Sequence, residues 1–272
     1  MLYADPVPDE FTSGSFYEQR PYYLSPEKLE GDYAPVRFER ELNVLRTWRS
    51  DGSVLDVGCS TGGFLHQLNT RFPGAYQGIG LDVAGPALDY AESRGVCVTR
   101  KPFLELDPGE RRFDGVTFWA VMEHLADPGK FLSKAAQLLV PGGHCFILAP
   151  NMRSLAVRLL GLRYRYILPE HLNYFTPATF RAFAMREPAF EIADAGSTHF
   201  NPAVIWQDFQ SGGREAPDQA RAQLLQRTTA WKQNPLLRPA RVFYSGIEKI
   251  LGSMNMADNL YVVLRKKRME AK

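Results

Sequence analysis

The feature that most constrains the fold is an alternation of strand and helix patterns between residues 53 and 149. The strand patterns are short apolar runs, and the helical segments between them end at Gly or Pro. Alternating β and α units predict a parallel sheet covered by helices on both faces. Such sheets bind ligands beyond the carboxyl ends of their strands, where the strand order reverses. We expect strands at 53–57, 76–81, 96–99, 113–119 and 144–149, and helices at 62–71, 85–94 and 127–139.

The segments around this alternation predict the domain organisation. Residues 1–52 are expected to form an N-terminal lid and helical segment, in which Asp32 caps a helix that ends near Asp51. Residues 53–200 are the expected core; they include a basic and aromatic substrate loop at 151–176, a helix from Pro177 to about 186 and a strand at 189–199. Residues 201–256 read as a helical insertion, and 257–272 as the last strand and a basic tail.

Composition limits the classes of function. The 272 residues are 45% hydrophobic and carry a net charge of +2, so no global charge favours a nucleic-acid partner. No apolar stretch approaches the ~20 residues of a membrane span, and the N-terminus lacks the pattern of a signal peptide. Three cysteines in no CxxC pair fit a reducing compartment. We therefore expect a cytoplasmic protein with a small-molecule partner.

The stretch "VLDVGCSTGGF" at 54–64 runs from a strand through a glycine turn toward a helix, and three ligands compete for it. A P-loop is excluded because no Lys follows Gly62 or Gly63. A dinucleotide site would need a glycine where this chain has Ser60. The third ligand, S-adenosylmethionine (SAM), has no pyrophosphate and tolerates a small serine. In that case Asp56 can orient the turn and face the cationic amino group of the ligand.

Four stretches in order resemble class I SAM-dependent methyltransferases. The "MEHL" and PGG-strand pieces are most similar to the branch that contains ubiquinone-biosynthesis O-methyltransferases, and "PEHLNYFTPATF" at 169–180 also recurs among relatives of that branch. The resemblance implies a doubly wound, Rossmann-like sheet of seven mostly parallel strands whose last strand is antiparallel. The four stretches are D-x-G-x-x-x-G at 56–62, "GLDV" at 80–83, "FDGVTFWAVMEHLADP" at 113–128 and "LLVPGGHCFILAPN" at 138–151.

The resemblance also implies roles for individual residues around the cofactor. The glycine turn would hold the methionine part of SAM, the end of the second strand the ribose and adenine, and the end of the fourth strand the sulfonium. The expected contacts are Gly58, Cys59, Ser60 and Gly62 for methionine, Asp82 for ribose, Val83, Pro102, Phe103 and Leu104 near adenine, and Trp119 near the sulfonium.

Methyl transfer from a sulfonium needs an aligned acceptor, and a hydroxyl acceptor also loses a proton. His124 and His171 both follow strands at the ligand end, so we expect one of them to be the base; His199 ranks lower. The ubiquinone branch has an E-x-x-E-H cluster that can bind a divalent metal. Here Ala120 replaces its first Glu, and Glu123 with His124 would be two adjacent ligands, so we expect no required metal.

Aromatic and basic residues outside the core are candidates for the acceptor site. Tyr17, Tyr22 and Tyr23 precede the core and could form a lid, of which Tyr23 is the expected substrate contact. In the loop 151–176 the expected contacts are Arg163, Tyr164 and Tyr174, since Arg and Tyr recognise carboxylates, phosphates and rings. The alternatives for these residues are a solvated basic helix and an ordinary aromatic packing layer. The insertion would complete the acceptor pocket or form a homodimer contact.

The predicted function is SAM-dependent methylation of a small or medium-sized metabolite, with oxygen as the methylated atom. Three alternatives stay open at this point: methylation at nitrogen or carbon, a SAM-fold protein that binds without catalysis, and an NAD(P) oxidoreductase. The last would require pyrophosphate on the glycine turn and a Tyr-x-x-x-Lys pair, which does not follow the fourth or fifth strand.

Overall fold

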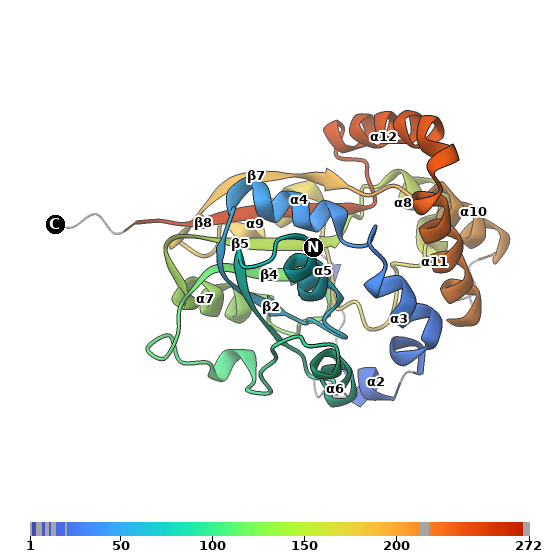
Figure 1. Cartoon of the computed structure of the whole chain (residues 1–272). Helices are drawn as coiled ribbons and strands as arrows, with labels where there is room; N and C mark the ends of the chain where they lie inside the picture. The colour runs from blue at the N-terminus through green and yellow to red at the C-terminus, as the bar shows by residue number, and fades with distance from the viewer. Residues whose placement is uncertain are drawn as a thin grey trace.

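The computed structural model describes residues 2–3, 7–8, 11, 15–19, 21–212 and 218–268, and its centre is one mixed sheet (Figure 1). Within these residues the sheet has six strands in the order β3–β2–β4–β5–β8–β7. All of them run parallel except β8, which is antiparallel to β5 and β7. The strands are β2 Gly52–Val57, β3 Tyr76–Leu81, β4 Phe113–Trp119, β5 Leu139–Pro150, β7 Phe190–Thr198 and β8 Asn259–Lys266.

The predicted doubly wound fold with an antiparallel last strand is confirmed, but the sheet has six strands rather than seven. The expected strand at 96–99 is reduced to one bridge between Val98 and Gly80. Two hydrogen bonds surround this bridge, Gly80 N to Cys97 O and Thr99 N to Gly80 O. A second, two-stranded sheet pairs β1 Leu2–Tyr3 with β6 Asn173–Tyr174. Since β3 and β4 lie on opposite sides of β2, the strand order reverses between β2 and β4.

Helices cover both faces of the sheet, as the alternation predicts. Successive strand residues point to opposite faces, so Phe146 belongs to one core while Cys145 and Ile147 belong to the other. One core packs against α7 and α9, and the other against α4, α5 and α6. These helices are α4 Glu39–Trp48, α5 Gly63–Arg71, α6 Gly85–Ser93, α7 Pro128–Leu138 and α9 Pro177–Ala184.

The predicted helix start at Asp32 is wrong. The N-terminal segment instead contains α2 Ser15–Glu18, η1 Pro21–Leu24 and α3 Pro26–Tyr33, and α4 begins only after Phe38. Asp32 lies inside α3, where its buried carboxylate pairs with Lys28 and Arg37. A carboxylate that is 3% exposed needs such partners, so it is unavailable as a helix cap.

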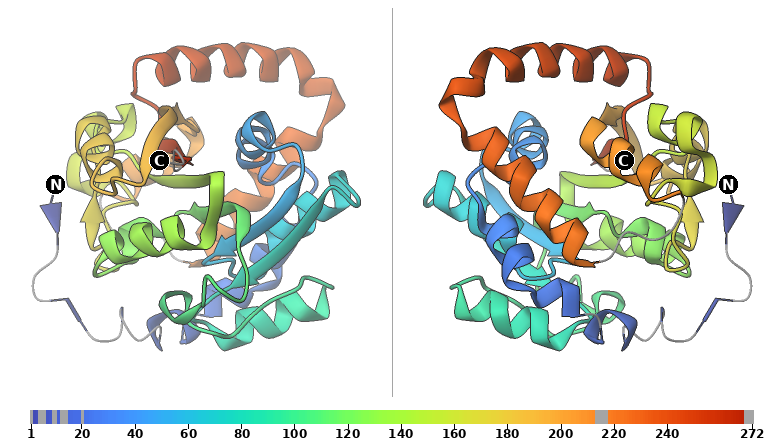
Figure 2. Two further views of the ribbon diagram at one scale, coloured as in Figure 1. Left: turned by 90° about the vertical axis from the view of Figure 1, so that its left-hand side faces the viewer. Right: turned by 90° about the vertical axis from the view of Figure 1, so that its right-hand side faces the viewer.

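The inserted segment is helical, with α10 Pro202–Gln210, α11 Asp218–Gln233 and α12 Arg238–Ser253. Helix α11 lies beside α3. A Cβ added at Gly31 of α3 would lie 2.5 Å from a methyl carbon of Leu225 of α11. The two views of Figure 2 show α12, in red-orange, at the outside of the molecule, where it packs against β7. Among the described residues, no helix has both the length and the apolar character needed to cross a bilayer. The division of the chain into these segments stays a prediction.

Candidate functional site

The glycine turn after β2 is fixed by the neighbouring strand. The N–H groups of Gly58 and Cys59 donate to the carbonyl of Leu81 at 2.8 and 3.0 Å. Gly58 and Gly62 have φ values of 71° and 78°, in the left-handed region that favours glycine. A Cβ at Gly58 would lie 2.6 Å from Val121. Both glycines are therefore required by backbone conformation, and the turn leads directly into α5.

Two carboxylates border this turn. Asp82 follows β3 and accepts the N–H of Ser60 at 2.8 Å and the N–H of Ala84 at 2.9 Å. Asp56 lies in β2, 2% exposed, and accepts the hydroxyl of Thr117 at 2.6 Å. Burial raises the pKa of Asp56 to about 7, with a further contribution from the charge of Asp82. Each oxygen of Asp82 has a second lone pair, so a ribose hydroxyl can still donate to it.

The N-terminal helix α3 lies against the turn. The hydroxyl of Tyr33 donates to the carbonyl of Thr61 at 2.6 Å, and the Thr61 hydroxyl donates to Asp32 at 3.3 Å. Gln67 of α5 donates to the carbonyls of Tyr33 and Ala34. These bonds anchor α3 at the entrance to α5, and the role of the N-terminal segment as a lid stays a prediction.

Trp119 ends β4 beside the turn, at the expected end of the sheet. Its ring packs edge-on against Phe64 of α5, with centroids 5.4 Å apart. The indole Nε1 is buried and has no hydrogen-bond partner within the described residues. Trp119 thus joins β4 to the first turn of α5.

The residues expected near adenine divide into core and surface. Phe103 is 3% exposed and packs on Phe118 and Phe131, so its side chain belongs to the core. Val83 and Leu104 are 63% and 42% exposed, and Pro102 is also exposed. The exposed residues are the ones whose side chains are available to an adenine ring.

The two candidate bases lie together. The rings of His124, in η3 Met122–His124, and His171 meet edge to face with centroids 4.6 Å apart. His171 Nδ1 is 2.8 Å from the carbonyl of Tyr166, and His124 Nδ1 is 3.0 Å from the carbonyl of Glu170. A carbonyl only accepts, so these bonds place the protons on Nδ1 and leave both Nε2 atoms with lone pairs.

The surroundings of this pair shift its protonation. Burial lowers the pKa of His124 to about 3, helped by His171, and burial lowers the pKa of His171 to about 4. Burial raises the pKa of Glu123 to about 8. One ligand atom from each of these three residues lies within 4.8 Å of the others. His171 therefore lies beside the adjacent pair Glu123 and His124, and the expectation of no required metal stays a prediction.

Tyr17 of α2 connects this cluster to the N-terminal segment. Its hydroxyl is 2.9 Å from His124 Nδ1, and its ring packs edge-on against Tyr23. Burial raises the pKa of the Tyr17 hydroxyl, followed by the charges of neighbours that include Glu123 and Asp82. The sequence suggested an aromatic lid but gave no signal that Tyr17 contacts the histidine. The side chain of Tyr22 lies outside the described residues.

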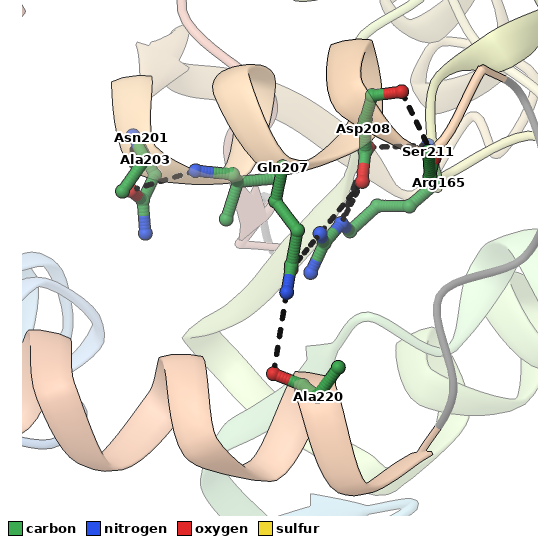
Figure 3. Close-up of polar contacts among 8 residues, drawn as sticks. Arg165, Asn201, Ala203, Gln207, Asp208, Ser211 and Ala220 are labelled. Carbon is green, nitrogen blue, oxygen red and sulfur yellow. Dashed lines mark hydrogen bonds and ion pairs between the residues drawn. The ribbon is translucent and has the colours of Figure 1, made fainter.

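The loop 151–176 is joined to the insertion by a buried ion pair. Arg165 binds both oxygens of Asp208 in α10, at 2.6 to 3.2 Å, and also Gln207 (Figure 3). The Arg165 side chain is 14% exposed and that of Asp208 only 4%. Both partners are polar residues 43 positions apart, and a sequence pattern gives no signal for such a pair.

The other acceptor candidates in this loop lie in different environments. Arg163, in η4 Gly161–Arg163, is exposed, whereas Tyr164 is 2% exposed and packs with Leu160 of α8 Leu155–Leu160. The burial of Tyr164 favours a packing role over the predicted substrate contact. Tyr174 donates to the carbonyl of Leu168 at 2.8 Å and lies near His171, with ring centroids 6.3 Å apart.

Comparison with known proteins assigns the family. A family model described as a methyltransferase domain matches residues 31–187, which is more than half of the chain. The chain belongs to the methyltransferase-domain family. The match begins at α3 and ends just before β7, so it contains the glycine turn, Asp82 and the histidine pair.

Curated relatives and solved structures agree with this family. A ubiquinone biosynthesis O-methyltransferase of Caulobacter vibrioides is 31% identical over 169 residues; the match covers 58% of this chain and 66% of the relative, just under two thirds of its length. The enzyme of the same name from Serratia proteamaculans is 30% identical over 198 residues, covering 64% and 78%. A SAM-dependent methyltransferase from Archaeoglobus fulgidus shares the fold, with a TM-score of 0.54, 17% identity and coverage of 93% and 99%.

Proposed function

We propose that this methyltransferase-domain protein transfers a methyl group from SAM to an oxygen of a small or medium-sized metabolite. One observation carries the choice of donor: the carboxylates of Asp56 and Asp82 border the glycine turn at the carboxyl ends of β2 and β3. A cationic ligand compensates such a pair, and SAM carries a sulfonium and an amino group. The pyrophosphate of a dinucleotide would instead add negative charge beside them.

The turn itself suits the methionine end of SAM. It lies at the point where strand order reverses, and it opens the nine-residue helix α5. The N-terminal N–H groups of that helix favour a ligand carboxylate. Asp82 would hold the ribose, and the exposed Val83 and Leu104 would border the adenine. SAM supplies an activated methyl group, so the remaining work of the protein is alignment and proton removal.

The histidine pair supports a hydroxyl as the acceptor. In the proposed step the acceptor oxygen forms a bond to the methyl carbon while the sulfur–carbon bond breaks. The hydroxyl proton moves to a free Nε2 of His124 or His171, and that imidazole later releases it to water. The products are the methyl ether and S-adenosylhomocysteine. The hydroxyl of Tyr17 lies 2.9 Å from His124 Nδ1, so α2 borders the histidine pair.

The acceptor region is proposed to lie between the N-terminal segment and the loop 151–176. Tyr17 packs against His124, Tyr23 packs against Tyr17, and Tyr174 lies near His171. The exposed Arg163 is available to an anionic group on the acceptor. The insertion 201–256, attached to the loop through Asp208, completes this region or forms a homodimer contact. The proposed location is the reducing cytoplasm, where cysteines stay free, as are Cys59, Cys97 and Cys145.

A screen for S-adenosylhomocysteine formation tests the proposed reaction. Candidate phenols, carboxylic acids, sugars and amines are incubated with SAM, and methylated products are identified by mass spectrometry. A phenol or other hydroxyl compound is expected to gain 14 mass units, one CH2, at oxygen. A product methylated at nitrogen or carbon would contradict the oxygen acceptor. If no compound of any class is methylated, the result would favour a binding protein without catalysis.

Removal of the histidines tests their role with the acceptor found in that screen. We expect His171→Ala and His124→Ala each to lower turnover by about 10²-fold or more while SAM affinity stays near the wild-type value. His66→Ala, on α5 and against Tyr33, is the control and should keep the wild-type rate. Full rates in both histidine variants would show that alignment alone carries the reaction.

A further inference from the structure

Helix α12 of the insertion turns an apolar face toward solvent, at the outside of the molecule (Figure 2). Its other face is held to the core, where Glu248 is 4% exposed and pairs with Arg40 of α4. On the same side the ring of Tyr244 stacks on Phe200, which follows β7. The outward apolar side chains are 60% to 73% exposed: Val242, Phe243, Ile250 and Met254. This face of α12 therefore has no covering element among the described residues.

The outward face is one stripe centred on Gly246. Residues three and four apart lie on the same side of a helix, so Val242 and Ile250 lie one turn before and one turn after Gly246. Phe243 and Lys249 flank this line at equal distances along the chain. Lys249 is exposed and is the one charged side chain on the stripe among those described. The stripe is therefore almost uncharged and has a similar character on either side of its centre.

The fold of α12 gives no reason for the glycine at this centre. Gly246 is helical and does not adopt a positive φ. A Cβ added there would meet no described atom within 4 Å, apart from the backbone of its own helix. Glycine inside a helix is destabilising relative to alanine. The missing side chain lets the backbone of a second helix approach closely, so Gly246 marks a point of close contact with another molecule.

A second copy of the chain fits this stripe by symmetry. In a two-fold arrangement both copies use the same surface, so each contact occurs twice. Two antiparallel α12 helices that cross at Gly246 place Val242 of one copy beside Ile250 of the other. They also place Phe243 beside Lys249, and a cation over an aromatic ring is a favourable contact. The stripe is therefore complementary to itself.

The exposed area suits a weak dimer. The four apolar side chains of the stripe present on the order of 500 Å² of accessible surface in each chain. Two copies would bury on the order of 1,000 Å² together, at the lower end of specific protein interfaces. An anionic lipid surface would instead favour an apolar face bordered by several Lys or Arg side chains. With Lys249 as the one described charge on the stripe, a second copy is the better occupant.

We propose that this chain forms a two-fold dimer through the outer face of α12, with the two helices antiparallel and crossing at Gly246. The family model ends at residue 187, so this surface belongs to the chain's own insertion. The dimer does not rest on the proposed methyl transfer, because association can be measured without SAM or an acceptor. Since Glu248 holds the inner face of α12 to α4, the dimer would also press the insertion against the core.

Sedimentation velocity over a range of protein concentrations, without SAM, tests the association. We expect a monomer–dimer equilibrium with a dissociation constant on the order of 10 µM. Val242→Glu and Ile250→Glu should each weaken association by at least about tenfold, because each dimer loses two apolar contacts and gains two buried charges. Met185→Glu, at a 56% exposed apolar residue after α9, is the matched control and should associate as the wild type does.

A cross-link tests the crossing point. Cys59 and Cys145 are buried, so Cys97→Ser removes the one exposed cysteine. In this background Gly246→Cys should form a disulfide-linked dimer on mild oxidation, because residues at a two-fold axis come within the roughly 4–7 Å between Cα atoms that a disulfide needs. Glu110→Cys, in an exposed loop, is the control and should stay uncross-linked.

Four results would overturn the proposal. The wild type could stay monomeric up to about 300 µM, far above the expected dissociation constant. Folded Val242→Glu and Ile250→Glu could associate as the wild type does, or Gly246→Cys could remain uncross-linked in a dimer. Monomeric protein that sediments with phosphatidylglycerol vesicles would assign the stripe to a lipid surface. A SAM titration of the same samples reports on the donor site alone, so failure of the dimer is distinguishable from failure of the proposed function.

Discussion

At the scale of single residues, the protonation of Asp56 couples the donor site to pH. Its carboxylate accepts the hydroxyl of Thr117, and burial raises its pKa to about 7. A cationic ligand interacts best with the ionised form, so binding draws the proton away. Near pH 7 a modest change of pH therefore changes the fraction of the protein in which Asp56 is ionised, the form that favours SAM binding.

We predict that SAM affinity falls by roughly tenfold as the pH is lowered from 7 to 5.5, because Asp56 becomes protonated. In the Asp56→Asn variant SAM binding should be weaker at pH 7 and nearly constant across this range. Calorimetric titrations at several pH values measure both quantities. Identical pH dependence in the variant and the wild type would assign the effect to another group.

At the scale of elements, the Arg165–Asp208 pair joins the loop before β6 to α10. Loss of one partner leaves a buried charge uncompensated, whereas apolar replacement of both partners is far less costly. We predict that Asp208→Ala lowers the free energy of unfolding by about 3–5 kcal/mol. The double variant Arg165→Met with Asp208→Leu should recover much of that loss.

Urea unfolding of the single and double variants measures this coupling. Arg163→Ala serves as the control, since its exposed side chain should change stability by no more than about 0.5 kcal/mol. A loss for Asp208→Ala no larger than that of the control would mean that the pair does not anchor the loop.

The elements also show what the sequence could and could not predict. The bounds of β3 and β4 agree with the predicted 76–81 and 113–119, because buried apolar runs between turn residues define such strands. The predicted helix start at Asp32 was wrong because the Asp32 side chain has other partners. It pairs with Lys28, one turn earlier in α3, and accepts the hydroxyl of Thr61, which is distant in the sequence. The meeting of His124 with His171 likewise depends on how the loop folds back after β5.

At the scale of the whole molecule, His144 of β5 pairs with Gly115 near the start of β4, whereas the candidate site lies at the carboxyl ends of the strands. Both of its ring nitrogens are buried and have no partner among the described residues. Burial lowers its pKa to about 4, and the charges of Arg49 and Arg265 act in the same direction. The folded protein therefore keeps this imidazole neutral where the unfolded chain would protonate it.

The lowered pKa predicts a loss of stability as the pH falls from about 6.5 to about 4, since the unfolded chain binds the extra proton in that window. His144→Leu should remove on the order of 2 kcal/mol of this acid dependence, which thermal unfolding at pH 7 and pH 5 can measure. His124 and His171 contribute in the same direction, so part of the dependence should remain. An unchanged difference between the two pH values would contradict the assignment to His144.

The central claim, that the glycine turn bordered by two carboxylates holds SAM, is tested most directly by calorimetric titration with SAM. We predict one SAM per chain in the wild type, no binding of NADH, and an affinity lower by about tenfold or more in Asp82→Asn, which loses charge-assisted hydrogen bonds to the ligand and the turn. Asp89→Asn, on the exposed side of α6, should bind SAM as the wild type does. Absence of SAM binding by the wild type, or equal SAM affinity in Asp82→Asn and Asp89→Asn, would contradict the claim.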